Sequence, residues 1–436
     1  MPLVSVVYIG LLVLVAATPA LLFLDNLVVA GAIQFYAAVS LMIIAIGIRP
    51  GEARHFFKLV RVPAALAAIP LLWMLIQLLP IGVGGLSRSI WESAASALET
   101  RRLSASISID PGLTLIALCR FASMVGIAFV AAAVSIDRHQ AEKLLLLLAS
   151  AAAVISLILL ASQIGGFSLT DELGTNGMHA TMVTAGIIGI ILFAASVIMV
   201  EERYEMGRGP RTSSSLRFIP IGLMVAGFLV CSSTLVAGDT NHAIFAAACG
   251  LATVVIIYFV RRLGFGPGAG LAMGCVAILA VAAIIWTKGP PATGDVSLRY
   301  MTDANSDVVT LDNRILDAVG LAGSGAGTFP VISTIYGTQD PSDVRPATFA
   351  GQIAIELGHP ALWIIVGSAC ILIVMFARGA FNRGRDCFYP LAGAGVTVAM
   401  VLNCFTSATL TNSAILLLVA VTLGVGFGQS IGRSLE

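Results

Sequence analysis

The chain has 436 residues, of which 58% are hydrophobic and only 11% are charged, and its net charge is +1. Soluble globular domains carry roughly 25% charged residues, so a water-soluble protein of this length is excluded. The sequence therefore predicts a chain whose solvent is the lipid bilayer.

The apolar residues are gathered into blocks of about 20, the length that an α-helix needs to cross a hydrocarbon core about 30 Å thick. The blocks show no alternation of polar and apolar residues and are too long for barrel strands. We therefore predict an all-α polytopic membrane protein with about twelve transmembrane helices. In chain order the helices are expected near residues 5–24, 27–48, 62–83, 113–136, 143–164, 180–200, 218–237, 242–260, 268–287, 359–377, 389–405 and 412–431.

The connections between the blocks contain turn residues and charges, as in RPGEARHFFKLVR (49–61). Lys and Arg are enriched on the cytoplasmic side of membrane proteins. Of the 24 Lys and Arg residues, sixteen fall in segments that would share one side, seven fall on the opposite side, and Arg120 lies inside the fourth block. We therefore expect both termini in the cytoplasm. The first block lacks the features of a cleaved signal peptide, so we expect it to be retained.

Two outer segments are long, at 84–112 and 288–358. The expected organisation is helices 1–9 in residues 1–287, a large outer loop in 288–358, and helices 10–12 in 359–436. Loops placed by a rigid scaffold often carry function, so we expect the site on the outer face. The seven cysteines form no CxxC pair and have no His at ligand spacing, so no metal site is expected.

The loop 288–358 contains GLAGSGAGTF (320–329). A Walker loop requires GxxxxGK[S/T], and no Lys follows Lys288. A dinucleotide loop requires GxGxxG, and here the third glycine, Gly327, comes one residue early. Both nucleotide-binding loops are excluded, and the glycines alone predict a plain turn.

The context of the glycines is more informative. Arg314 precedes GSGAGTF, and Tyr336 and QIAIELGHPALWII (352–365) follow it. This run resembles the central region of the O-antigen ligase and O-antigen polymerase superfamily. GTNGMHATMVTAGI (174–187), at the start of the sixth predicted helix, resembles the same family more weakly. Members of the family also have twelve spans, with their main outer loop before the tenth.

The resemblance implies transfer of glycan from an undecaprenyl-diphosphate carrier, at the periplasmic face of the bacterial inner membrane, to a growing chain or to lipid A core. It implies no metal and no other cofactor. The partners would be the undecaprenyl-diphosphate-linked glycan, membrane lipid and other polysaccharide-assembly proteins, with no nucleic acid.

The leaving diphosphate develops negative charge, which Arg side chains neutralise well because their fork binds phosphate oxygens in pairs. By position, Arg314 matches the family's Arg ahead of the glycine turn, and it is our first catalytic candidate. Arg299 and Arg345 are further candidates for binding the substrate. The alternative for each of them is a solvated or snorkelling surface charge.

The turn and its flanks supply the other substrate-binding candidates. We expect the backbone of Gly325 and Gly327 to shape the floor of a lipid-diphosphate site, and Tyr336 and Glu356 are further candidates for binding the substrate. Glu356 is expected at the start of the tenth helix, where an ionisable residue near hydrocarbon is costly and hence a functional candidate. The favourable interaction of a carboxylate with a helix N-terminus is the alternative.

Two features of the family are missing. The His-Asn pair of the ligases falls here on Ala347 and Thr348, and the Ser-Arg-Gly motif is replaced by AGDTNHAIF (237–245). His242, next to Asp239, is our second catalytic candidate, since a His beside a carboxylate acts as a base or binds phosphate. The alternative is that these residues simply end a helix in water.

The remaining charged residues have weaker patterns. Arg120 lies within a predicted span, where a cation normally faces a cavity or a partner, so it is a candidate for the lipid diphosphate or a buried acid; the alternative is snorkelling. "NRILDAVG" predicts a short helix capped by Asn313. The acids at 303, 307, 312 and 317 do not fit an EF-hand and predict a solvated acidic loop.

Together these patterns favour a polysaccharide polymerase, because the ligase-type His is missing. A ligase, a non-catalytic membrane component of an export machine, and a transporter or flippase remain as alternatives.

Overall fold

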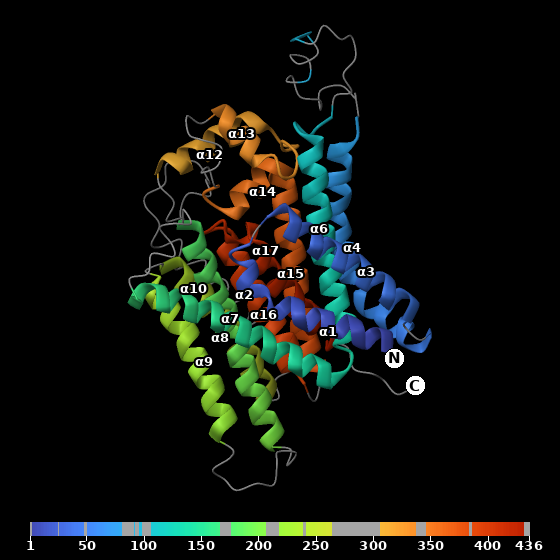
Figure 1. The fold of residues 1–436 in the computed structure, drawn as a ribbon, viewed down its shortest axis with the longest axis vertical. Helices are drawn as coiled ribbons and strands as arrows, with labels where there is room; N and C mark the ends of the chain where they lie inside the picture. Colours follow the sequence, from blue (N-terminus) through green and yellow to red (C-terminus); the bar gives the residue numbers. More distant parts are fainter. Residues whose placement is uncertain are drawn as a thin grey trace.

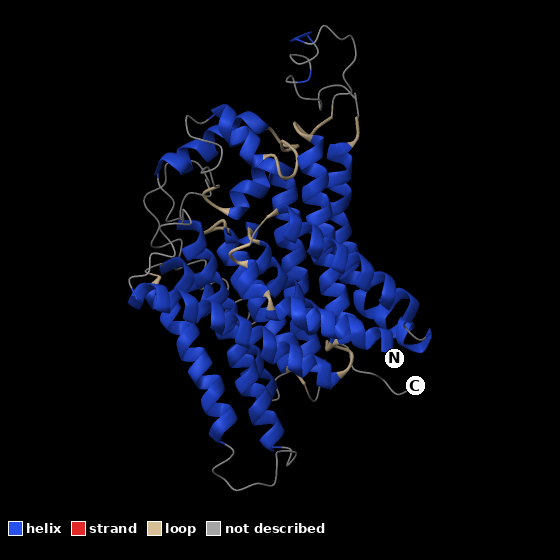
Figure 2. Ribbon diagram, viewed as in Figure 1, coloured by secondary structure: helices blue, strands red, loops and turns tan. Residues whose placement is uncertain are grey.

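The computed structural model describes residues 2–24, 26–47, 50–80, 91, 96–97, 106–165, 176–205, 218–238, 241–263, 306–336, 346–382 and 386–430. Those residues form helices joined by turns and loops, with no β-strand among them, which confirms the all-α class (Figure 2). In chain order the labelled elements are α1 (Pro2–Ala16), α2 (Thr18–Leu21), α3 (Leu27–Gly47), α4 (Pro50–Leu78), α6 (Pro111–Val134), α7 (Arg138–Gly165), α8 (Asn176–Glu205), α9 (Phe218–Ala237), α10 (Asn241–Arg262), α12 (Ser306–Val319), α13 (Phe329–Tyr336), α14 (Phe349–Leu357), α15 (His359–Asn382), α16 (Phe388–Cys404), the 3-10 turn η3 (Thr409–Thr411) and α17 (Ser413–Gly428).

Eight of these helices are long and apolar enough to cross a membrane, and shorter apolar helices lie at Val4–Ala16, Phe388–Cys404 and Ser413–Gly428. The chain is therefore a membrane-embedded helical bundle. Each of these helices corresponds to one predicted block. The remaining predicted block, 268–287, lies outside the described residues.

The predicted connection at 49–61 is wrong, because α4 begins at Pro50 and includes it. Three of its four cations, Arg54, Lys58 and Arg61, are exposed, whereas Leu59 and Val60 are buried; the fourth, Arg49, lies outside the described residues. A spacing of four and then three residues places the cations on one face of a helix. This part of the sequence is therefore the amphipathic first half of a helix. It resembled a loop because it contains many charged residues.

Helix α8 is the centre of the bundle. Its apolar span is 89% buried, compared with 17% for α9 and 11% for α15, so α9 and α15 present most of their surface to lipid. Small residues allow the close contacts of α8, as membrane helices require. A side chain at Gly189 would lie 2.5 Å from Cys231 Sγ of α9.

Three short helices, α12, α13 and α14, lie together at one end of the bundle (Figure 1). We call residues 306–336 and 346–358 the cap, and that end of the bundle the cap end. They belong to the predicted outer loop 288–358, whose other residues lie outside the described ones. Asn313 was predicted to cap a short helix; this is wrong, because α12 begins seven residues earlier, at Ser306.

Candidate functional site

The glycine turn at 320–327 packs against two other segments of the chain. Gly320, Gly323, Gly325 and Gly327 all have positive φ, the conformation that favours glycine. The turn also needs glycine for space, since a side chain at Gly325 would lie 2.3 Å from Ser108 Oγ and 2.9 Å from Ser108 Cα. Gly323, Gly325 and Gly327 are therefore fixed by packing within the protein, whereas Gly320 has open space around it.

The Glu356 carboxylate binds the turn from the other side. Oε2 accepts a hydrogen bond from the backbone N–H of Gly327 at 2.8 Å, and Oε1 accepts one from Phe329 N–H at 3.2 Å and one from Gln352 Nε2 at 2.9 Å. Burial raises the pKa of the Glu356 carboxyl, whereas the three donated bonds act to lower that pKa. The turn thus binds a carboxyl group, and that group is a side chain of the same protein.

Glu356 also lies in a different element from the one expected. It was predicted at the start of the tenth membrane helix, but it lies near the C-terminal end of α14, before the break at Gly358 and the start of α15. Glu356 does not lie at the N-terminus of α15, but it does bind the N-terminus of another helix, since Phe329 is the first residue of α13. Its other donors come from the glycine turn and from α14 itself.

Helix α4 reaches the cap through Gln77, whose side chain is fully buried. Gln77 Nε2 donates to the carbonyl oxygens of Ala322 (3.1 Å) and Glu356 (3.0 Å), while its Oε1 accepts from Ala326 N–H at 3.2 Å. Trp73, one turn earlier, donates from Nε1 to Leu357 O at 2.8 Å. Sequence analysis missed both residues, although a Gln within an apolar span is itself a signal of a polar contact.

Helix α6 fixes the turn from its own N-terminus. Thr114 Oγ1 donates to Ala326 O at 3.0 Å and lies 2.7 Å from Ser108 Oγ. Ile109 N–H donates to Ser324 O at 2.9 Å. The cap is therefore attached to α4 and α6 by buried hydrogen bonds, which are costly to leave unmade.

Asp312 was predicted to lie in a solvated acidic loop, and this is wrong. Its side chain faces the interior of the cap, the residue is 5% exposed, and Oδ2 accepts a hydrogen bond from Ala347 N–H at 2.9 Å. The pKa of Asp312 is raised to about 6, because burial raises it by more than the hydrogen bond from Ala347 lowers it. The apolar positions Leu311, Ile315 and Val319 at helical spacing were the signal that this face of the segment is buried.

The two residues that flank the turn in the family resemblance both lie on the surface of the cap. Arg314, in α12, is exposed, and Tyr336, at the end of α13, is 44% exposed. The cap therefore contains Arg314, Tyr336, the two candidate glycines and Glu356 in one unit. Arg299 and Arg345 lie outside the described residues.

Arg120 and His242 lie in other elements. Arg120, in α6, donates to Thr411 O and, at 2.9 Å, to Ser413 Oγ, so it stabilises the junction between η3 and α17. Its candidate role toward a lipid diphosphate or a buried acid stays a prediction. His242 lies in the first turn of α10 and is half-buried. Asp239 lies outside the described residues, so its pairing with His242 stays a prediction.

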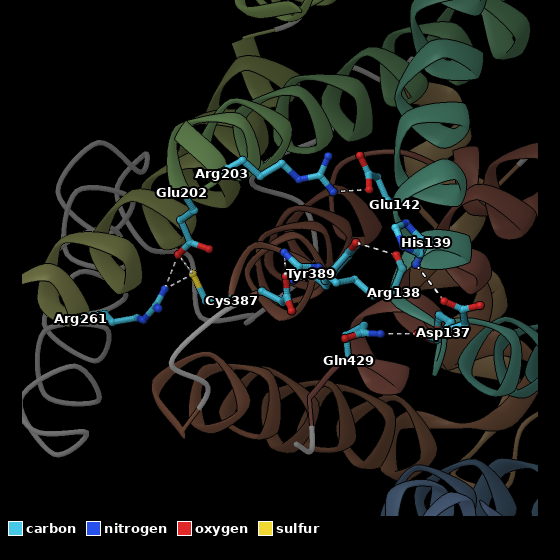
Figure 3. A network of polar contacts seen from close by, with 12 residues as sticks. Asp137, Arg138, His139, Glu142, Glu202, Arg203, Arg261, Cys387, Tyr389 and Gln429 are labelled. Carbon is cyan, nitrogen blue, oxygen red and sulfur yellow. Dashed lines mark hydrogen bonds and ion pairs between the residues drawn. The ribbon is translucent and has the colours of Figure 1, made fainter. Parts of the chain in front are cut away.

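The opposite end of the bundle is held by charged side chains, and we call it the ion-pair end (Figure 3). Arg138 pairs with Asp386 at 2.7 Å, and Arg261 pairs with Glu202 at 2.7 Å. The Cys387 thiol donates to Glu202 Oε1 at 3.1 Å and also contacts Arg261. Two further pairs are Arg203–Glu142 and Arg262–Glu201.

These pairs connect the end of α8 to the start of α7 and the end of α10, and they join the start of α7 to the segment just before α16. The four arginines belong to the sixteen cations that the charge count assigned to one side. Their pairing places the segments that carry them at one end of the bundle. This is expected if successive helices cross the membrane in alternating directions.

No protein-family model matches this chain, and no curated protein matches it either.

Proposed function

We propose that this protein is a membrane glycosyltransferase that polymerises undecaprenyl-diphosphate-linked glycan units for exopolysaccharide or O-antigen synthesis. A ligase, which transfers finished glycan by the same reaction, is the alternative within this proposal. The observation that carries the proposal is the cap: the residues of the motif are gathered into one unit at one end of a membrane bundle, with Arg314 and Tyr336 exposed on it.

The proposal includes the topology. In it the chain crosses the bacterial inner membrane twelve times, the cap faces the periplasm and both termini face the cytoplasm. The pairing of Arg138, Arg203, Arg261 and Arg262 at the end opposite the cap supports this orientation, since Lys and Arg are enriched on the cytoplasmic side.

The geometry of the cap changes which groups the proposal assigns to the diphosphate. The N–H groups of Gly327 and Phe329 already donate to Glu356, so they are not free to bind the diphosphate. We therefore assign the diphosphate to the exposed face of α12, where the Arg314 guanidinium is open to solvent. The glycine turn then acts indirectly, by holding the cap in place.

In the proposed reaction an acceptor hydroxyl oxygen attacks the anomeric carbon of the lipid-linked glycan. The new glycosidic C–O bond forms while the bond from that carbon to the diphosphate oxygen breaks. The hydroxyl proton passes to a base or to water, and undecaprenyl diphosphate leaves with the electron pair. Arg314 would stabilise the charge that develops on the diphosphate.

A non-catalytic component of a polysaccharide export machine is the second candidate. The observation in its favour is that the cap's own carboxylates, Asp312 and Glu356, bind the buried backbone donors of Ala347, Gly327 and Phe329. A transporter or flippase is less favoured, because it does not explain the large outer loop with its ordered motif.

Deleting the gene tests the proposal directly. A strain without a polymerase should accumulate single repeat units on the carrier, and a strain without a ligase should accumulate unligated polymer there. Arg314→Ala should reproduce the accumulation of the deletion strain, because one diphosphate contact is lost while the exposed site leaves folding intact.

The matched control is Asp317→Ala, an exposed substitution one turn further along α12. It should leave the polymer unchanged. Full polymer in Arg314→Ala cells with normal protein levels would contradict the catalytic assignment and favour the non-catalytic component.

A further inference from the structure

Helix α12 has an apolar face that contains one acid. Ile315 is fully buried and Val319 is 6% exposed, and they pack with Phe329 and Ile332 of α13 and with Ile355 of α14. Asp312 lies on the same face, at three residues from Ile315 and seven from Val319. The acid is therefore held among apolar side chains, where its charged form is costly.

The two oxygens of Asp312 are in different situations. Oδ2 accepts the hydrogen bond from Ala347 N–H, just before α14, and lies close to Gly351, where a side chain would be 3.7 Å from it. Oδ1 is buried and has no hydrogen-bond partner within the part of the chain that the structure describes. A proton on Oδ1 would neutralise the buried group without breaking the bond that Oδ2 accepts.

Other ionisable groups in the described residues do not neutralise Asp312. Glu356 of α14 is bonded to Gly327, Phe329 and Gln352, and Tyr336 of α13 is exposed. Asp110, beside Ile109, caps α6 by accepting from Leu113 N–H. On α12 itself Arg314 and Asp317 are exposed.

We propose that Asp312 is a proton-operated latch: a proton on Oδ1 holds α12 docked on the start of α14, and loss of that proton loosens α12. Since α12 also carries Arg314, the latch controls how firmly that cation is held on the cap. The inference goes beyond the proposed glycosyltransferase function and does not rest on it.

The direction of the pH effect follows from burial. The pKa of Asp312 is about 6 when α12 is docked, and about 3.9 is expected when the helix is free in water. The docked state keeps its proton over a wider pH range, so docking is strongest below the lower pKa. Docking weakens as pH rises through the higher pKa, and the change from pH 5 to pH 8 is about tenfold.

Hydrogen–deuterium exchange on the full chain in lipid nanodiscs measures docking without any substrate. After correction for the intrinsic pH dependence of exchange, the protection of residues 306–319 should be about tenfold lower at pH 8 than at pH 5. Equal protection at the two pH values in the wild type would overturn the proposal, whatever any variant does.

Asp312→Asn removes the ionisation while keeping the shape, so its protection should no longer depend on pH. Asp317→Asn, an exposed change on the same helix, should keep the wild-type dependence. An unchanged pH dependence in Asp312→Asn would also overturn the latch. If that variant does not fold, the infrared carbonyl band of a protonated carboxyl in the wild type should disappear between pH 5 and pH 8, and its persistence would be the contrary result.

Discussion

The two ends of the bundle are held together by different kinds of contact. At the cap end, buried side chains bond to backbone N–H and C=O groups, as Gln77 and Glu356 do. At the ion-pair end, side chains pair with side chains, some of them partly in water, such as Arg262 with Glu201 at 52% and 44% exposure.

This difference predicts how strongly a substitution at each end should destabilise the protein. A backbone group cannot move to a new partner when its side-chain partner is altered, so a buried donor at the cap end is left unpaired. A long side chain at the ion-pair end can turn to solvent or to another charge, and exposed pairs contribute only about 0–1 kcal/mol. Substitutions should therefore weaken the cap end more than the ion-pair end.

The largest effect is expected for Gly325→Ala. The new methyl group would meet Ser108, and the residue would keep a φ of +111 that only glycine adopts easily. Strain and overpacking together should cost about 2–6 kcal/mol. The measurement is the protection of residues 320–329 against hydrogen exchange.

Gly320→Ala is the matched control for that experiment. Gly320 also has positive φ, but a side chain there would meet nothing within 4 Å. Only the backbone cost of roughly 1–2 kcal/mol is expected. Equal losses in the two variants would show that packing against Ser108 does not hold the turn.

An intermediate effect is expected for Glu356→Gln. The amide nitrogen replaces one of two acceptor oxygens that receive three hydrogen bonds, so at least one donor among Gly327, Phe329 and Gln352 loses its partner. Each buried unpaired donor costs about 1–3 kcal/mol. Thermal unfolding in detergent gives the comparison with wild type.

The same chemical change at the other end, Glu201→Gln, serves as its reference. Glu201 is bonded to Arg262 and Tyr258 near solvent. A loss of stability as large as that of Glu356→Gln would remove the distinction between the two ends.

The smallest effect is expected for Arg262→Gln, below about 1 kcal/mol. The small loss should itself shrink when the salt concentration rises from about 0.01 M to about 1 M, because salt screens exposed charges. Unfolding measured at both concentrations in wild type and variant gives the salt-dependent part. A loss that is large and independent of salt would mean that this pair is effectively buried.

Some features of the site were accessible from sequence and others were not. The position of Arg314 and Tyr336 around the glycines was read from an ordered motif, and both belong to the cap. The contact of Glu356 with Gly327 was not predicted, because a carboxylate and a glycine N–H 29 residues apart have no periodic relation that a sequence pattern reveals. Asp312 was misplaced because three neighbouring acids suggested solvent, although the apolar spacing around it indicated a buried face.

What the sequence determined by itself is the membrane bundle. The length of an apolar run is a local property, and a run of about 20 such residues fits the bilayer as a helix whatever its neighbours are. Charged residues between the runs similarly predicted which segments share an end, and the pairing of Arg138, Arg203, Arg261 and Arg262 agrees with that grouping.

Only the tertiary structure decided what the glycine turn binds. Its partners come from α4, α6 and α14, and the bond from Gln77 to Glu356 O joins residues 279 positions apart. Which buried donor meets which acceptor depends on how those helices pack, because each polar group removed from water must be paired by whatever the fold brings to it. In this fold the acceptor for the N–H groups of Gly327 and Phe329 is the side chain of Glu356.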